Sequence, residues 1–253
     1  MKNILLKKEY VEQGPLILVN RQNTLKTKIQ SYNLVPFNSQ YPEILLEYNC
    51  HAELQQALYE IRAGDRIVPV SGYRSKEKQE EIYQESLQEN GKTFTQKYVA
   101  YPDCSEHQTG LAIDLALRQD HIDFIRPQFP NQGICQEFRN HMANYGFIQR
   151  YPEEKEKITQ IASEEWHFRY VGYPHSEIIR KNGVCLEEYL EDLKQYKYGK
   201  SSYIFQDYEI SYLEMDENLK EITMADDERV TISGNNENGV IITKRKKKAS
   251  DRI

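Results

Sequence analysis

Three short segments of the sequence concentrate the side chains that can do chemistry. They are residues 71–74 (SGYR), 105–114 (SEHQTGLAID) and 164–167 (EEWH). Among them they supply imidazoles, carboxylates and a guanidinium, the groups that bind a metal ion, move protons and stabilise a developing negative charge. A catalytic site is therefore expected where these segments meet.

Asp114 is the most informative residue of the three segments. It lies within the apolar run 111–117, which predicts a buried strand. A lone carboxylate there costs several kcal/mol unless it is paired or bound to a metal ion. His107 precedes this run and His167 lies in a second apolar strand, and two imidazoles with one carboxylate are a common Zn²⁺ set that leaves a fourth position for water. Spacing alone also allows structural histidines and an aspartate that is simply the buried partner of an arginine.

Glu164, three residues before His167, is a candidate general base. Residues three apart face opposite sides of a regular strand, so the two side chains share a site only if a turn or bulge lies between them. With that bend, Glu164 could take a proton from the attacking water and pass it to the leaving amine. Cys104, three residues before His107, is interpreted as a free thiol rather than as an extra ligand.

Hydrophobic periodicity, together with glycine and proline positions, predicts the elements that hold these segments. Helices are predicted over 51–62, from Ser75 to a stop at Asn90-Gly91, over 135–145, from Pro174 onward, and along Leu186, Leu190 and Leu193. Strands are predicted at 16–20, 66–70, 111–117, 147–149 and 166–171, with Pro69 favouring an edge or a bulge. The gap at 118–134 is either a loop beside the active site or a plain surface connection.

The sequence changes in character after Tyr196. Residues 198–202 resemble a linker, and β-type runs follow at 203–205, 208–213, 230–232 and 240–243, with a turn at 233–239. We expect an α+β catalytic domain over 1–197 and a small β-rich C-terminal appendage with a basic tail over 198–253. The appendage is shorter than the roughly 70–80 residues at which a core easily stands alone.

Composition excludes several classes of protein. In 253 residues, 33 Lys and Arg against 39 Asp and Glu give a net charge of -6, so no overall positive field attracts nucleic acid. The basic run 244–248 is interpreted as a solvated tail rather than as an RNA or membrane anchor. No stretch approaches the roughly 18 apolar residues of a membrane span, and the N-terminus lacks the apolar core of a secretory signal. A cytoplasmic protein is expected, with Cys50, Cys104, Cys135 and Cys185 as reduced thiols.

The three segments together resemble the zinc D,D-peptidases of the VanY/VanX type. The motifs occur in the family's order, and the match spans about residues 15–195, with Glu165 standing where the family commonly has Pro before the tryptophan. The resemblance implies a central antiparallel sheet flanked by helices and one zinc ion per chain. The site residues that it implies are His107, Asp114 and His167 as zinc ligands, Glu164 as catalytic base and acid, Arg74 for the oxyanion, and Ser105 for the substrate's terminal carboxylate.

Gln79 is a weaker candidate for substrate binding, and its alternative is a solvated residue on the helix after Arg74. VanY-like motifs on a chain without an export signal resemble the bifunctional VanXY enzymes. Those enzymes cleave D-Ala-D-Ala and the terminal D-Ala of the UDP-linked pentapeptide precursor in the cytoplasm, and so support vancomycin resistance. These two molecules are the expected partners, with no nucleic acid and no membrane span, and homodimerisation stays open.

Two other functions stay open at the sequence level. One is a peptidoglycan endopeptidase of lysin type, for which residues 198–253 would be the wall-binding module. The other is a non-catalytic module that holds D-Ala termini, although pure binding needs neither Glu164 nor Arg74.

Overall fold

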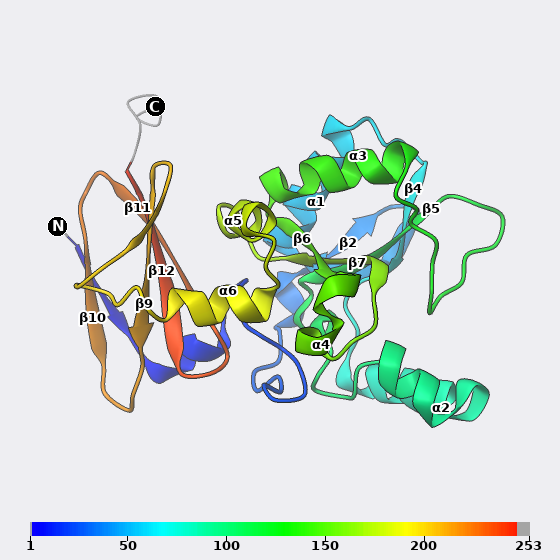
Figure 1. The fold of residues 1–253 in the computed structure, drawn as a ribbon, viewed down its shortest axis with the longest axis horizontal. Coiled ribbons are helices and arrows are strands. Elements are labelled where there is room, and N and C mark those ends of the chain that lie inside the picture. The colour runs from blue at the N-terminus through cyan, green and yellow to red at the C-terminus, as the bar shows by residue number, and fades with distance from the viewer. Residues whose placement is uncertain (1, 247–253) are drawn as a thin grey trace. The chain divides into compact units, whose positions relative to one another are not determined.

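The computed structural model describes residues 2–246, which form two compact units (Figure 1). One unit is Val19–Cys185, and the other combines the segment up to Leu18 with the segment from Leu186 onward. This division differs from the expected boundary after residue 197, because the first 18 residues and the helix that begins at Leu186 group with the C-terminal strands.

A four-stranded antiparallel sheet forms the centre of the Val19–Cys185 unit. Its order is β4 (Ile67–Ser71), β5 (Ala112–Leu117), β7 (Glu164–Tyr170) and β6 (Phe147–Tyr151). The predicted central antiparallel sheet is therefore confirmed, and Pro69 lies as expected in an edge strand, beside a register shift between β4 and β5. Pro69 is compatible with this place because an edge strand needs fewer ladder hydrogen bonds.

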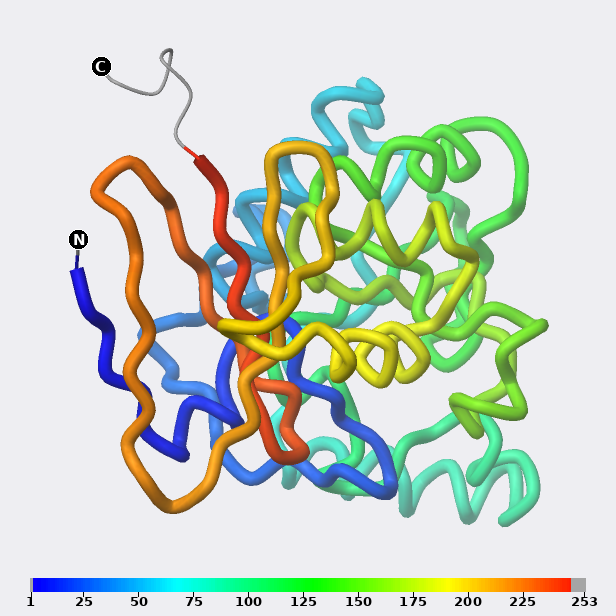
Figure 2. Tube along the Cα trace, turned by 60° about the vertical axis from the view of Figure 1, so that its left-hand side comes forward, coloured from blue at the N-terminus to red at the C-terminus, as the bar shows by residue number. Residues whose placement is uncertain are grey.

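Helices flank this sheet, with α3 on one side and α2 on the other (Figures 1 and 2). The helices of this unit are α1 (Tyr48–Glu60), α2 (Lys76–Tyr98), α3 (Gly133–His141), α4 (Glu156–Thr159) and α5 (His175–Asn182). Short 3-10 turns accompany them, namely η2 (Ser31–Asn33), η3 (Glu106–Thr109), η4 (Met142–Tyr145) and η5 (Glu153–Lys155).

Helix α2 begins as predicted but does not end as predicted. The Ser75 side chain accepts a hydrogen bond from the Lys78 backbone N–H and so caps the first turn. At Gly91 the backbone adopts φ 77° and ψ 168°, which kinks the helix, and the chain then returns to helical geometry as far as Tyr98. The glycine therefore interrupts α2 instead of stopping it.

Two parts of the N-terminal third differ from the sequence prediction. A hairpin of β2 (Leu34–Asn38) and β3 (Tyr41–Glu47) was not predicted. Residues 16–20, predicted as a strand, form no strand, although Leu16 to Val19 are buried. Burial explains why this run is apolar. Its backbone hydrogen-bonds to a loop rather than to a strand, since the Leu18 N–H donates to the Asn235 carbonyl.

The other unit is rich in β-structure, as predicted. One sheet pairs β1 (Lys2–Leu6) with β10 (Lys220–Met224), and a second has the order β11 (Glu228–Gly234), β12 (Gly239–Lys246), β9 (Tyr208–Glu214) and β8 (Tyr203–Phe205). Helix α6 (Leu186–Leu193) and the 3-10 turn η1 (Lys8–Glu12) complete it. Lys244 to Lys246 belong to β12, so this part of the basic run is strand rather than tail, and the rest of the run lies outside the described residues.

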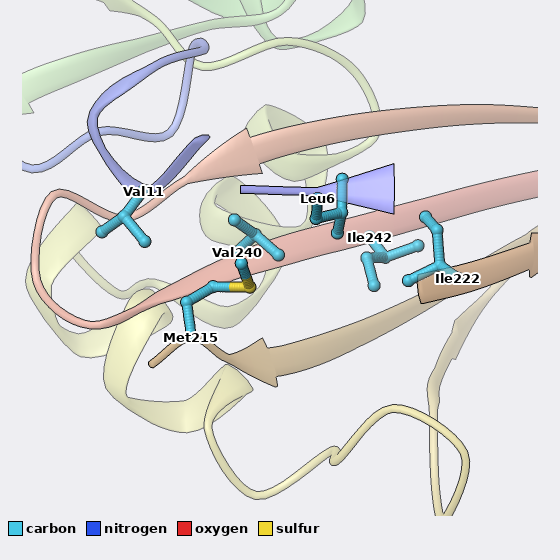
Figure 3. Packing of buried hydrophobic residues seen from close by; sticks show 6 residues of the cluster. All are labelled: Leu6, Val11, Met215, Ile222, Val240 and Ile242. Carbon is cyan, nitrogen blue, oxygen red and sulfur yellow. The ribbon is translucent and has the colours of Figure 1, made fainter. Parts of the chain in front are cut away.

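The core of this unit joins the two ends of the chain. Figure 3 shows its buried side chains, which converge from β1, η1, β10, β12 and the segment after β9. They are Leu6, Val11, Met215, Ile222, Val240 and Ile242. The N-terminal strand is thus an integral part of the C-terminal unit.

Two expectations from composition can be compared with the described residues. Between residues 2 and 246, no helix combines the length and apolar character that a membrane crossing requires. All four cysteines are free and buried, as expected.

Candidate active site

His107, Asp114 and His167 converge at the neighbouring strands β5 and β7. Asp114 pairs directly with His167 across the antiparallel ladder, which places their side chains on the same face of the sheet. His107 lies in η3, just before β5. One ligand atom from each of the three buried residues lies within 4.8 Å of the others. Two imidazole nitrogens and a carboxylate oxygen, brought together in a buried place, fit a zinc ion.

His107 presents its Nε2 atom to this cluster. Its Nδ1 lies 2.7 Å from the Gly72 carbonyl oxygen, which can only accept, so Nδ1 carries the proton. Nε2 lies 3.1 Å from Asp114 Oδ2. Burial and the charge of Arg74 lower the pKa of His107, which keeps the ring neutral. A neutral ring with a free Nε2 lone pair is the form that binds a metal ion.

Glu164 enters the site through an irregularity in β7. Gln149 pairs with Phe168, but Tyr151 pairs with Glu164, so β7 spans four residues where β6 spans two. The bend that a shared site requires is present, and Glu164 Oε2 lies 3.8 Å from His167 Nδ1. Burial raises the pKa of Glu164 to about 8, and the negative charge of Asp114 acts in the same direction.

Arg74 contacts Asp114 directly. Its Nη2 lies 2.9 Å from Asp114 Oδ2, and its Nε donates to Ser71 Oγ at 2.7 Å. Asp114 is therefore the partner of an arginine and of two histidines at once. Its interpretation as a metal ligand and its interpretation as the buried partner of an arginine are compatible. Burial alone would raise the pKa of Asp114, but the interactions with the histidines outweigh it and hold that pKa well below its usual value. Asp114 is ionised in this setting.

A cavity that is open to solvent is lined by these residues. Ser105 and Gln79 both line it and are buried. The alternative of a solvated Gln79 is wrong, because its Nε2 donates to the Ala100 carbonyl at 2.8 Å and its Oε1 accepts from Arg74 Nη1 at 3.4 Å. The remaining lining residues are Ile82, Tyr98, Val99, Ala100, Glu106, Phe124, Ile125, Tyr151, Ile161 and Trp166, in addition to the residues described above.

Two lining residues, Phe124 and Ile125, come from the gap at 118–134. The segment therefore lies beside the cavity and is not a plain surface connection. The guanidinium of Arg74 lies 5.5 Å from the centre of the Phe124 ring. This contact joins the segment to one of the candidate catalytic side chains. Cys104, the rejected extra ligand, is a free thiol that does not line this cavity.

Sequence reasoning assigned no role to Glu106, which lies beside His107 in η3. Its carboxylate is fully buried, lies 2.8 Å from Arg150 Nε and from Arg169 Nη1, and faces His167 Nε2 at 3.5 Å. Burial alone would raise the pKa of Glu106, but the two guanidinium charges outweigh it and hold that pKa well below its usual value. The only sequence signal was its place inside the second motif, since both arginines lie far away along the chain.

The chain is similar to known D-alanyl peptidases. The VanY family model, described as D-alanyl-D-alanine carboxypeptidase, matches residues 44–173. The bifunctional D-Ala-D-Ala dipeptidase and carboxypeptidase VanXYC of Enterococcus gallinarum is 40% identical over 183 residues, which cover 71% of this chain and 95% of that protein.

Solved structures of D,D-peptidases are also similar to this chain. The vancomycin resistance D,D-dipeptidase VanXYg, in complex with a D-Ala-D-Ala phosphinate analogue, is 47% identical with a TM-score of 0.94, over 97% of this chain and 99% of that one. The D,D-pentapeptidase VanY of a VanB-type resistance cassette, a glutamate-to-alanine mutant in complex with Zn(II), is 33% identical with a TM-score of 0.57, over 70% of this chain and 98% of that one. The chain is thus similar, in sequence and in fold, to D,D-peptidases of defined activity.

Proposed function

Because the chain belongs to the VanY family of D-alanyl-D-alanine carboxypeptidases, we propose that it is a zinc-dependent D,D-peptidase acting on two substrates. It hydrolyses D-Ala-D-Ala and removes the C-terminal D-Ala of the UDP-linked pentapeptide precursor. The observation that carries the proposal is the buried convergence of His107, Asp114 and His167 beside Glu164. Similarity to the bifunctional VanXYC supports the double activity, and similarity to the vancomycin resistance D,D-dipeptidase VanXYg supports a role in vancomycin resistance.

The zinc ion would be held by His107 through Nε2, by an Asp114 carboxylate oxygen and by His167 through Nδ1. The chemistry available from a zinc ion at such a site is Lewis-acid activation of water and of the scissile carbonyl. The rest of the reaction depends on side chains of this chain.

Glu164 moves the proton. Its carboxylate accepts a proton from the attacking water and donates it to the nitrogen of the departing D-Ala as the peptide bond breaks. A buried carboxylate whose pKa is about 8 holds a proton readily between these two transfers.

Arg74 stabilises the negative charge that develops on the scissile carbonyl oxygen. Its guanidinium is fixed by Ser71, Gln79 and Asp114, so little reorganisation is needed as the charge appears. The hydroxyl of Ser105 would hydrogen-bond the terminal carboxylate of the substrate. Gln79 lines the same cavity and is assigned to substrate binding together with its contact to Arg74.

The decisive experiment is D-Ala release from D-Ala-D-Ala by the purified chain, before and after treatment with a chelator. We expect activity to disappear with the chelator and to return with added zinc. In Glu164→Ala, we expect activity to be lost while zinc stays bound. Full activity of that variant would overturn the assigned role of Glu164.

A steady-state comparison of D-Ala-D-Ala, D-Ala-D-Ser and the UDP-linked pentapeptide then defines the substrate range. Cleavage of intact wall without cleavage of the dipeptide would favour an endopeptidase of lysin type. Calorimetric binding of D-Ala-D-Ala without turnover would favour a binding module. We further propose that the chain works in the cytoplasm, where both substrates occur, which fractionation of the native host would test.

A further inference from the structure

Glu106 lies among three basic side chains that are all buried. Arg150, Arg169 and His167 surround its carboxylate, and the exposed fraction of each side chain is 5% or less. The arginines meet Oε1, while Oε2 is the oxygen that faces His167. The two guanidinium groups alone would satisfy the charge of Glu106, so its approach to the imidazole calls for a separate explanation.

The two nitrogens of His167 face different carboxylates. Nδ1 lies 2.9 Å from Asp114 Oδ1, and Nε2 lies 3.5 Å from Glu106 Oε2. A neutral imidazole has one N–H and one lone pair, and an ionised carboxylate can only accept a hydrogen bond. When both ring nitrogens carry protons, each carboxylate accepts one of them. Once Nδ1 gives up its proton to bind a metal ion together with Asp114, Glu106 is the acceptor that holds the remaining proton on Nε2.

His107 is held in the opposite tautomer. The Gly72 carbonyl fixes the proton on Nδ1 of that ring and leaves Nε2 free, as described above. Each histidine thus has an acceptor on the side away from the cluster, a backbone carbonyl in one case and a buried carboxylate in the other. Such outer partners orient metal-binding histidines and raise the basicity of the nitrogen that binds.

We propose that Glu106 is the positioning residue of His167. It fixes the ring orientation and the tautomer in which Nδ1 is available to the metal ion, and Arg150 and Arg169 hold its carboxylate in place. The Tyr151 ring, 5.0 Å from that of His167 between ring centres, restrains the imidazole from a further direction. The proposal rests on the proposed function only for the presence of a zinc site.

The first test is zinc affinity, measured by competition with a chromogenic chelator. Glu106→Gln keeps the size of the side chain, but its amide can present N–H groups to His167 and lacks the negative charge. We expect it to bind zinc 10–100-fold more weakly than the unaltered chain, with an unchanged circular dichroism spectrum. Glu177→Gln is the matched control, since Glu177 is another buried carboxylate paired with an arginine, Arg180, and its zinc affinity should not change.

Activity offers a rescue experiment on the same variants. At limiting zinc, Glu106→Gln should lose most of its D-Ala-D-Ala hydrolysis, and excess zinc should restore a large part of it. A defect that is merely structural would not respond to zinc. Zinc affinity within twofold of the unaltered chain, in a folded Glu106→Gln, would overturn the proposal.

The second test needs no variant and so holds even if Glu106→Gln fails to fold. In the zinc-loaded chain with ¹⁵N-labelled histidine, long-range ¹H–¹⁵N spectra report which nitrogen of each ring is protonated. We expect one metal-bound histidine with its proton on Nε2 and one with its proton on Nδ1. The Nε2 proton should exchange slowly with solvent, because Glu106 accepts its hydrogen bond in a buried place. A rapidly exchanging Nε2 proton, or two metal-bound histidines with the same pattern, would refute the role of Glu106. Both tests separate this proposal from the proposed function, because neither zinc affinity nor the spectra depend on turnover of D-Ala-D-Ala.

Discussion

Asp114 shows how a carboxylate is accommodated in an apolar strand. It has Arg74 on one side and an imidazole nitrogen close to each of its two oxygens. An unpaired carboxylate in such a place would cost several kcal/mol, and these contacts offset that cost. The same contacts bring the oxygens of Asp114 to the point where the histidine nitrogens meet.

Zinc binding is expected to release a proton from His167. Burial alone would lower the pKa of His167, but hydrogen bonds to Asp114 and Glu106 outweigh it and raise that pKa to about 9. Because Nδ1 must be free of its proton to bind a metal ion, this proton by itself lowers zinc affinity about tenfold for each pH unit below about 9. Zinc affinity falls as the pH falls, because a raised pKa makes the proton a stronger competitor of zinc for Nδ1 at neutral pH.

Calorimetry at pH 7 in two buffers of different ionisation enthalpy counts the released protons. Glu164→Gln is the variant of choice, because Glu164 also has a pKa above 7 and would release a proton of its own. We expect about one proton per zinc ion for that variant. A zinc affinity that does not vary with pH between 6 and 8 would contradict the prediction.

Arg74→Lys tests whether a fixed guanidinium is needed or only a positive charge. Lysine keeps the charge but cannot contact Ser71, Gln79 and Asp114 together as the arginine does. We expect kcat for D-Ala-D-Ala to fall roughly 10²–10³-fold, as for loss of an oxyanion donor, with a smaller change in KM. Lys76→Ala, at an exposed cation two residues away, is the control and should leave both constants unchanged.

At the scale of elements, the strands predicted from sequence agree with the observed central sheet to within a few residues at their ends. The predicted ranges 66–70, 111–117, 147–149 and 166–171 overlap β4, β5, β6 and β7, respectively. The strands that escaped prediction are β1, β2, β3 and β10. β1 and β10 pair with each other across most of the chain, so the local pattern of either one carries little information. β2 and β3 form a hairpin, but each contains a proline, which weakens the sequence signal for a strand.

Some residues of the candidate site could be predicted from sequence and others could not. The metal-binding types and the need for a bend before His167 followed from chemistry and strand geometry. Glu106 did not, since its environment is created by Arg150 on β6 and Arg169 on β7. A glutamate in a motif has no recognisable function until the fold shows which groups surround it.

Gly72, which follows β4, lies against the backbone of β3. A Cβ at this position would collide with the Leu45 carbonyl oxygen, and the Gly72 carbonyl is the acceptor for His107. Gly72→Ala should therefore shift this carbonyl, lower stability by about 1–3 kcal/mol and weaken zinc binding about tenfold or more. Chemical denaturation and chelator competition measure the two effects.

Gly64→Ala is the matched control for this variant. Gly64 has φ 59°, and no atom lies within 4 Å of the place that a Cβ would take, so alanine there adds backbone strain of about 1–2 kcal/mol without touching the site. It should lose stability and keep full zinc affinity. Equal zinc affinity in both glycine variants would mean that the Gly72 carbonyl does not position His107.

At the scale of the whole molecule, the metal-binding candidates and the cavity lie in the Val19–Cys185 unit, whereas β1 belongs to the other unit. Leu6→Ala should destabilise that other unit by about 2–5 kcal/mol, because Leu6 is fully buried in its core. Leu5→Ala, one residue earlier and 53% exposed, should cost much less.

Differential scanning calorimetry measures the effect of each leucine variant on unfolding, and zinc titration measures its effect on the site. We expect Leu6→Ala to change the unfolding profile and to leave zinc affinity within twofold of the unaltered chain. Equal unfolding of the Leu5 and Leu6 variants would show that β1 does not contribute to the core. A large fall in zinc affinity would show that the site depends on the other unit.

The pairing of β1 with β10 also has a consequence for biosynthesis. Leu5 and Glu221 are neighbours in the folded sheet but lie 216 residues apart in the chain. At translation rates of 5–20 residues per second, β1 waits roughly 10–40 s after its synthesis for β10. By the end of that interval the nascent chain contains every strand of the central sheet, while Leu6 is still without its core. A chaperone that binds emerging apolar segments would therefore meet β1 before its partner strand exists.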